Sequence, residues 1–517
     1  MPIPRYVFPY LRRADGPNPF AQTLSPRLRV LVDQPLVSGP VDGQGDYHGY
    51  PFIGGGSTGF PDALVVLRSY LVHPALEILR VSDELREVGD VVFGEPGMYD
   101  TLAFERKTAD GGYYSGVDCY SGAQAEAVEL TTRYGIDAAD SHDGAVLYRL
   151  GNELEADVTV TDRRWLLSER SRPYGKHLAN LFSPDEALAL IGLFLRWHRH
   201  PVIIGGSEIR WDPTSMRRSI AFTAMPAFER WNQAGRAWHD NTPGRDLSLE
   251  RLNQTMLTRI SRAFQFRDSV FALSASMVDA EPEEMLCDLD SLLFSLVGAF
   301  DIAAIIADLV LGLGSKPQRI GWQKTGNKEW QKKLEPVAKD LYDYTAPGTE
   351  MQHVFQVLRW LRNSVHNEAL NLTRDNRQFY VTLDAHTQDA LREFLHARHT
   401  RWTVADLGIR VQPPGGATAG KWLEGTGRAS YTVRNANAPK LADPLDGQLV
   451  VDVRDFVNRV FPASLQCLDQ IMRLTPMSRA PGCSAALDNP SRANLPWHYS
   501  DTTGHRLRFL YGITEIP

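Results

Sequence analysis

The chain has 517 residues, of which 43% are hydrophobic and 23% charged, and its formal net charge at pH 7 is −7. At about 100 to 200 residues per domain this length predicts several domains, and the composition excludes collagen-like, low-complexity and wholly disordered chains. Because the overall charge is negative, a nucleic-acid partner requires a local basic patch.

Two further features bear on the compartment. The first 20 residues carry arginines among prolines and contain no apolar stretch, so we expect no secretory signal and a cytoplasmic protein. The four cysteines have no C-x-x-C spacing, which argues against a disulfide framework or a thiolate zinc site; they are Cys119, Cys287, Cys467 and Cys483.

Residues 1–215 are predicted to form an α/β domain. Residues 28–33 (LRVLVD) and 157–161 (DVTVT) are typical of strands. Ser183 and Glu186 have the spacing of a capping box, with Pro184 at the first helical position, so a helix should begin there.

Acidic residues stand at the ends of these elements. Asp33 ends the first strand, Asp143 opens a helical stretch and Asp162 follows the second strand. Carboxylates at the carboxyl edge of an α/β sheet are able to bind Mg²⁺ or Mn²⁺ for phosphodiester hydrolysis. Alternatively, Asp143 is a helix cap and Asp162 a turn residue.

The stretch from 140 to 167 resembles a PIN-type nuclease domain in its helix, its strand, its Thr-Asp pair and the following Arg-Arg-Trp-Leu-Leu. The resemblance implies a PIN-like α/β sandwich in which Asp33, Asp143 and Asp162 are metal ligands for Mg²⁺ or Mn²⁺. Glu84 and Glu87 are both candidates for the middle acid, and the choice stays open. A degenerate, inactive PIN-like fold is the favoured interpretation.

Residues 216–372 are predicted to form an all-α domain, with helices at 249–276, 282–311, 329–344 and 350–370. The apolar stretch 292–313 is long enough to span a bilayer, but Asp301 and Asp308 would each be costly there. We therefore expect a buried helix and no membrane association.

A basic segment with aromatic residues follows, at 315–333. Its cations and two tryptophans suggest that the segment binds single-stranded RNA through phosphate contacts and base stacking. A solvated connector between helices is the alternative. The candidate RNA-binding residues are Lys316, Arg319, Trp322, Lys324, Lys328, Trp330, Lys332 and Lys333.

The helix at 350–370 carries the sharpest pattern. Thr349 and Gln352 predict its start as a capping box. At about 100° per residue one face is apolar, with Val354, Val357, Leu358, Leu361 and Val365. The other face holds polar residues at offsets 0, 3, 4 and 7, namely Arg359, Arg362, Asn363 and His366.

That polar face has the groups needed for RNA chemistry. Arginine offers permanently charged donors to phosphate oxygens, and histidine titrates near neutrality, so it is able to move a proton at a ribose 2′-hydroxyl. A solvated face of an ordinary amphipathic helix is the alternative. Phe355, one turn before Arg359, suggests that this side meets another surface.

The segment 361–368 (LRNSVHNE), at the end of a module of long helices, resembles the signature helix of HEPN domains. The resemblance covers roughly residues 248–372 and implies a helical bundle, a homodimer with one shared cleft, and metal-independent RNase activity. It implies that His366 transfers the proton, that Arg362 or Arg359 stabilises the phosphate and that Asn363 assists. Three residues separate Arg362 from His366 and six separate Arg359 from it, so both arginines stay candidates.

Residues 373–517 are predicted to form an α+β extension, with strands at 379–383, 408–412 and 429–433 and helices at 387–397 and 453–473. The whole chain is thus expected to be a multidomain protein of an α/β part, an all-α part and this extension.

The predicted function is RNA cleavage without a metal cofactor, in a toxin or anti-phage defence setting of the kind that HEPN proteins serve. Two alternatives stay open. One is a scaffold that only dimerises or binds RNA, and the other is a metal-dependent nuclease using the N-terminal carboxylates. The sequence does not name an antitoxin or operon partner.

Overall fold

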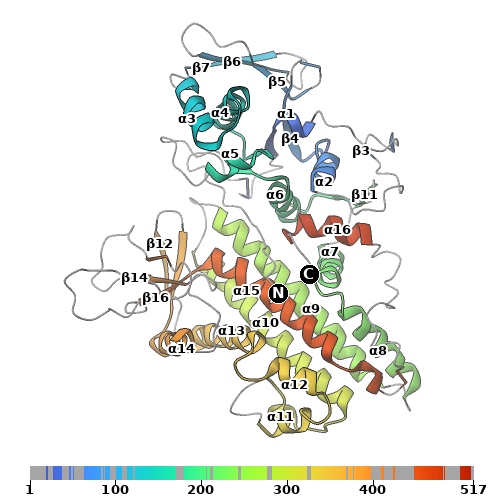
Figure 1. The fold of residues 1–517 in the computed structure, drawn as a ribbon. Coiled ribbons are helices and arrows are strands. Elements are labelled where there is room, and N and C mark those ends of the chain that lie inside the picture. The colour runs from blue at the N-terminus through green and yellow to red at the C-terminus, as the bar shows by residue number, and fades with distance from the viewer. Residues whose placement is uncertain are drawn as a thin grey trace, which may run out of the picture.

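The computed structural model (Figure 1) describes these parts of the chain: residues 19–20, 27–37, 46–47, 50–51, 63–82, 85–86, 88–93, 101–107, 113–119, 123–169, 180–204, 207–209, 213–242, 246–275, 282–322, 328–367, 371–375, 378–396, 409–412, 423–424, 448–480, 482–483 and 501–513. Within them an N-terminal sheet lies at one end of the molecule and a bundle of long helices at the other.

A twisted sheet organises the N-terminal region. Its strand order over the described residues is β7-β6-β5-β4-β1-β8-β9. The strands β5, β4, β1, β8 and β9 are mutually parallel, and β6 and β7 add an antiparallel edge. The bounds are β1 (Leu28–Val32), β4 (Leu76–Val81), β5 (Asp90–Phe93), β6 (Thr101–Lys107), β7 (Tyr113–Cys119), β8 (Val158–Val160) and β9 (Leu181–Phe182). The predicted α/β class and its two strands are confirmed.

Strand β1, inside the sheet, is buried on both faces, which explains its nearly continuous apolar sequence. Leu28, Val30 and Val32 point into one core, and Leu31 points into a second core on the other side. Helices cover both faces: α2 (Ala63–Tyr70) and α6 (Pro184–Trp197) on the first, and α3 (Ala123–Tyr134), α4 (Ala138–Glu153) and α5 (Arg164–Glu169) on the second. The short elements α1 (Gln34–Val37), β2 (Asp46–Tyr47), β3 (Tyr50–Pro51), β10 (Val202–Ile204) and β11 (Ser207–Ile209) complete the region.

Helix α6 connects the sheet to the rest of the molecule. It begins with the predicted capping box: the Glu186 amide donates to the Ser183 hydroxyl at 3.4 Å, and the Ser183 amide donates to the Glu186 carboxylate at 3.0 Å. Its residues from 186 to 195 are all buried, because the helix contacts α2 on one side and the helical bundle on the other.

Long helices form the bundle. They are α7 (Pro213–Ala224), α8 (Phe228–Asn241), α9 (Ser248–Ala275), α10 (Pro282–Leu311) and α13 (Glu350–Asn367), with the short η1 (Pro317–Arg319), α11 (Lys328–Leu334) and α12 (Lys339–Thr345). Helices α9 and α10 form a long antiparallel pair (Figure 1), and α13 packs against α10.

Helix α10 is the helix expected to be buried rather than membrane-spanning. Among the described residues it alone has the length and composition of a membrane span, and 72% of its most apolar window is buried inside the protein. That burial is typical of a core helix.

The C-terminal residues contact the helical bundle. An antiparallel sheet, ordered β12-β13-β16-β14-β15 over the described residues, packs beside the bundle with α14 (Ala385–His396). Its strands are β12 (Asn371–Asp375), β13 (Gln378–Thr382), β14 (Ile409–Gln412), β15 (Leu423–Glu424) and β16 (Gln448–Asp452). Helix α15 (Val453–Leu474), followed by η3 (Met477–Arg479), packs on α9, α10 and α13, so it belongs to the bundle core. The strand predicted at 429–433 lies outside the described residues.

The last described helix, α16 (Asp501–Leu510), returns to α6 and α7. A buried charge cluster holds it there. Arg196 donates to Asp268 at 2.7 Å and to the Leu510 carbonyl at 2.6 Å, while Arg267 donates to Asp268 at 2.7 Å and to the Tyr511 carbonyl at 3.0 Å. The cluster thus ties the N-terminal sheet, the bundle and the C-terminal segment together.

Candidate functional site

Helix α13 forms as its sequence predicts. The Gln352 amide donates to the Thr349 hydroxyl at 3.3 Å, and the Gln352 side-chain oxygen accepts from the Gly348 amide at 3.0 Å. Its apolar face is buried through residues 354, 357, 358 and 361, whereas Arg359, Arg362 and Asn363 are half-buried.

Phe355 lies differently from the prediction. Its side chain is 1% exposed, and its ring centroid is 5.2 Å from that of Phe300 on α10. The ring closes the contact between α13 and α10, so it does not present an aromatic surface to a partner.

Three helices bring their polar residues together beside α13. Arg359 and Arg362 of α13 and Arg259 of α9 are close enough to act electrostatically on the same carboxylate, that of Asp301 on α10. Phe294 and Gly298 precede Asp301 on α10 by seven and three residues, which places all three on one helix face. We call this set the arginine face: Arg259, Phe294, Gly298, Asp301, Arg359 and Arg362.

Phe294 is the exposed aromatic ring of the arginine face. Its side chain is 47% exposed, whereas the other exposed large hydrophobic residues among those described are valines. The guanidinium carbon of Arg259 lies 5.0 Å from the ring centroid and that of Arg362 lies 5.6 Å away. Both distances fall within the range of cation–π attraction.

Gly298 makes room for Arg259. A Cβ atom at position 298 would lie 2.3 Å from Nη1 and 2.6 Å from Cζ of Arg259. The guanidinium group therefore rests against the bare backbone of α10, and any larger residue at 298 has to displace it.

The three arginines form no close ion pair with an acid among the described residues, although Asp301 acts on all of them electrostatically. No ion pair within 4 Å joins Arg259, Arg359 or Arg362 to any acid in the part of the chain that the structure describes, and the buried Nε atoms of Arg259 and Arg362 have no hydrogen-bond acceptor. An unpaired buried donor costs about 1 to 3 kcal/mol.

The pKa shifts agree with this description. Burial lowers the pKa of the Arg359 guanidinium, Asp301 partly offsets the effect and Arg362 adds to it. Asp301 reaches solvent, yet surrounding protein raises the pKa of its carboxyl group, and the three arginines offset only part of that rise. Three positive charges thus face one negative charge, which leaves the arginine face positive in a protein of net negative charge.

His366 and Asn363 follow on the same helix. The helix backbone extends through Asn367, but the side chains of residues 365 to 367 lie outside the described residues. Helix geometry puts position 366 about 6 Å along the axis from Arg362 and about 10 Å from Arg359. Asn363 is half-buried.

The structure corrects the stacking role predicted for the basic segment. Trp322 and Trp330 are each 1% exposed and pack edge to face at 5.1 Å. Their ring N–H groups donate to the Phe300 carbonyl at 2.8 Å and to the Asp308 carboxylate at 3.0 Å. The two indoles anchor α10 from inside, so they are not available to bases.

The cations of that segment remain at the surface. Arg319 forms an ion pair with Glu329 at 2.6 Å, and Lys333 donates to the Leu313 carbonyl at 3.1 Å. The other exposed ammonium groups are those of Lys316, Lys328 and Lys332. Lys324 lies outside the described residues.

The predicted metal ligands of the N-terminal domain are not grouped around an open site. Asp33 is buried at the carboxyl end of β1, where it accepts from the Thr161 hydroxyl at 2.7 Å and from Arg163 at 2.8 Å. Arg163 also contacts Asp140. Burial lowers the pKa of Arg163, but Asp33, Asp140 and Asp143 together raise it above its usual value.

Of the other predicted acids, Asp143 acts electrostatically on the same arginine. Asp143 and Asp162 are exposed, and Glu84 and Glu87 lie outside the described residues. Within the described ranges no group of three His, Cys, Asp or Glu side chains is arranged to hold a metal ion. At the carboxyl edge of the sheet, the sequence predicts a metal ion, but the structure places the paired side chain of Arg163 there.

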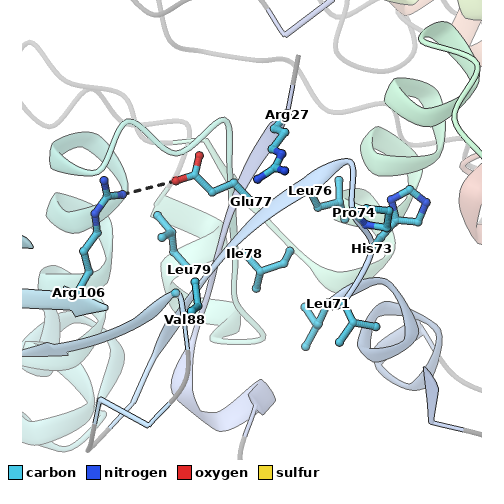
Figure 2. A pocket seen from close by; sticks show the side chains of 12 residues that line it. Arg27, Leu71, His73, Pro74, Leu76, Glu77, Ile78, Leu79, Val88 and Arg106 are labelled. Carbon is cyan, nitrogen blue, oxygen red and sulfur yellow. Dashed lines mark ion pairs between the residues drawn. The ribbon is translucent and has the colours of Figure 1, made fainter. Parts of the chain in front are cut away.

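A cavity of about 360 Å³ lies in the N-terminal region (Figure 2). It opens at the amino ends of β1, β4 and β5 and is lined by Arg27, Glu77 and Arg106 among apolar residues. Glu77 is already engaged by Arg29 at 3.0 Å and by Arg106 at 3.6 Å. The cavity belongs to the sheet, at the far end of the molecule from α13 (Figure 1), and shares no residue with the arginine face.

No protein-family model, no curated protein and no solved structure matches the chain. Functional inference therefore depends on the chemistry of the arginine face.

The sequence reasoning found two of the three arginines and missed Arg259, Phe294 and Gly298. Asp301 was noticed only as a charge in an apolar stretch. Arg259 stands in a helix with several arginines, and Phe294 stands in the most apolar helix of the chain, so neither has a local signal that separates it from its neighbours.

Proposed function

We propose that the protein is a metal-independent endoribonuclease of the HEPN type whose site is the arginine face together with His366. The observation that carries the proposal is the set of unpaired guanidinium groups one and two turns before that histidine on α13. Phosphodiester oxygens supply the acceptors that these groups lack.

In the proposed reaction, the 2′-hydroxyl of a ribose attacks its own 3′-phosphodiester. The bond from phosphorus to the 5′-oxygen of the next nucleotide breaks, which leaves a 2′,3′-cyclic phosphate and a 5′-hydroxyl. His366 takes the 2′-hydroxyl proton or protonates the leaving oxygen. Arg359 and Arg362 stabilise the charge that develops on the phosphate oxygens, and Asn363 assists as a hydrogen-bonding side chain.

The HEPN resemblance supports a homodimer in which α13 helices of two copies share one cleft. In that arrangement the second copy supplies further arginines and a second His366. It also supports a toxin or anti-phage setting, in which uncontrolled activity harms the cell and a partner protein restrains it.

Incubation of purified protein with total RNA and with tRNA, with and without EDTA, tests the proposal. We expect EDTA-resistant cleavage that disappears in His366→Ala and persists in Arg236→Ala, which removes an exposed arginine of α8. Analysis of the product ends then identifies the cyclic phosphate.

The same assay separates the two alternatives. Cleavage that EDTA and Asp143→Ala abolish assigns the activity to the N-terminal carboxylates. RNA binding and dimerisation without turnover, unchanged by His366→Ala, assigns the protein to the scaffolds.

A further inference from the structure

The exposed ring of Phe294 and the arginines around it form a second recognition element beside the proposed cleavage residues. The ring projects from α10 between α9 and α13, and roughly half of its surface faces solvent. The nearest guanidinium carbons, at 5.0 and 5.6 Å from its centroid, stay beyond the separation of stacked planar groups, so the exposed part of the ring is open to a planar partner.

We infer that Phe294 is a stacking platform for an unpaired base and that Arg259 and Arg362 bind the phosphates on either side of it, so the protein selects single-stranded over double-stranded RNA. The inference rests on the proposed function because it names the substrate class of the same site. Aromatic rings stack on bases of any sequence, and arginines beside them follow the backbone.

Duplex RNA does not fit this arrangement. In a duplex the bases are stacked on one another inside the helix, and its surface offers phosphates and 2′-hydroxyl groups. A duplex therefore presents no free base on which the Phe294 ring can stack, whereas an unpaired nucleotide offers both its base and its phosphates.

Arg259 has a built position in this arrangement. Gly298 lets the guanidinium group rest against the α10 backbone, beside the ring. Among the described residues it has no close ion pair, and Asp301 acts on it only electrostatically. The guanidinium group of Arg259 lies at the end of a long, flexible side chain. Gly298→Ala should therefore displace that group without preventing folding and without changing the charge of the protein.

The test uses fluorescein-labelled 2′-O-methyl oligonucleotides, which the proposed reaction does not cleave, as a single strand and as a duplex with the complement. Fluorescence anisotropy gives the affinity of the full chain for each. We expect Phe294→Leu to weaken single-strand binding by roughly 5- to 150-fold and to leave duplex binding unchanged, and Phe294→Trp to retain single-strand binding.

Two further measurements complete the test. Gly298→Ala should weaken single-strand binding by displacing Arg259. Light scattering of Phe294→Leu should show the same oligomeric state as the unchanged protein, and loss of a dimer in that variant would overturn the inference by placing the ring in an interface between two copies.

Failure of this inference is distinguishable from failure of the proposed function. Equal binding of both probes by Phe294→Leu and the unchanged protein overturns the stacking platform, even if His366-dependent cleavage is observed. Phe294-dependent single-strand binding without cleavage of natural RNA supports the platform and rejects the ribonuclease.

Discussion

Charged side chains gather both at the carboxyl edge of the N-terminal sheet and on the arginine face of the bundle. The two regions differ in the partners that their arginines have. At the sheet edge, Arg163 is held by Asp33 and Asp140. On the bundle, Arg259 and Arg362 keep buried Nε atoms without an acceptor. The charges at the sheet edge are paired within the fold, whereas the three arginines of the bundle share one acid, Asp301, and leave an excess of positive charge.

The largest expected effect is on catalysis. His366→Ala should lower RNA cleavage by roughly 10²- to 10⁴-fold, because general acid–base transfer contributes about that much to a rate. Single-turnover cleavage of tRNA measures the change, with Arg236→Ala and the thermal midpoint as controls. A rate within threefold of the unchanged protein would remove His366 from the mechanism.

The second effect separates the two regions directly. Arg163→Met leaves the buried carboxylate of Asp33 without its partner, so we expect the free energy of unfolding to fall by about 3 to 5 kcal/mol. Arg359→Met removes a guanidinium that burial and Arg362 already disfavour, so stability should change by less than about 0.5 kcal/mol. Denaturant unfolding of both variants measures this difference, and equal losses would mean that the arginine face is also structural.

A smaller effect concerns salt. If Arg259 and Arg362 contact phosphates, replacing either by alanine should reduce the slope of log affinity against log salt by about 0.7 for a single-stranded probe. Binding titrations at several KCl concentrations give the slope. Arg319→Ala serves as the control, because Arg319 is exposed and paired with Glu329. A slope that only Arg319→Ala changes would place the phosphates elsewhere.

The smallest effect depends on pH. The folded-state pKa of Asp301 is raised above its ordinary value of 3.8, so its ionisation opposes folding. Stability should decline as pH rises from about the ordinary value through the raised one and then level off.

Asp301→Asn should remove that part of the pH profile and should also tighten anion binding at neutral pH, since the only acid of the arginine face is lost. Denaturant unfolding from pH 4 to 7 tests the first effect. The charged groups facing Asp301 are the guanidinium groups of Arg259, Arg359 and Arg362. A profile identical in the variant would contradict the assignment.

Strong local signals made much of the fold predictable. The apolar run of β1, the capping box of α6 and the periodic face of α13 each depend on residues close in sequence, and all three elements occur where the sequence places them. The packing of α15 on the bundle and of α16 on α6 was not predictable, because both depend on partners hundreds of residues away.

The site was predictable in part for the same reason. Arg359 and Arg362 share one helix, so spacing alone puts them on one face. Arg259 and Phe294 join them only through the packing of α9, α10 and α13. The tryptophans were misread because lysines beside a tryptophan suggest a surface. In the structure Lys328, Lys332 and Lys333 face solvent, while the indole of Trp330 among them enters the core.

The cluster of Arg196, Arg267 and Asp268 has a consequence for biosynthesis. Two of its guanidinium N–H groups donate to the carbonyls of Leu510 and Tyr511, which leave the ribosome more than 200 residues after Arg267. These two hydrogen bonds therefore cannot form until residues 510 and 511 have been synthesised, so α16 joins the contact between α6 and α9 late in folding.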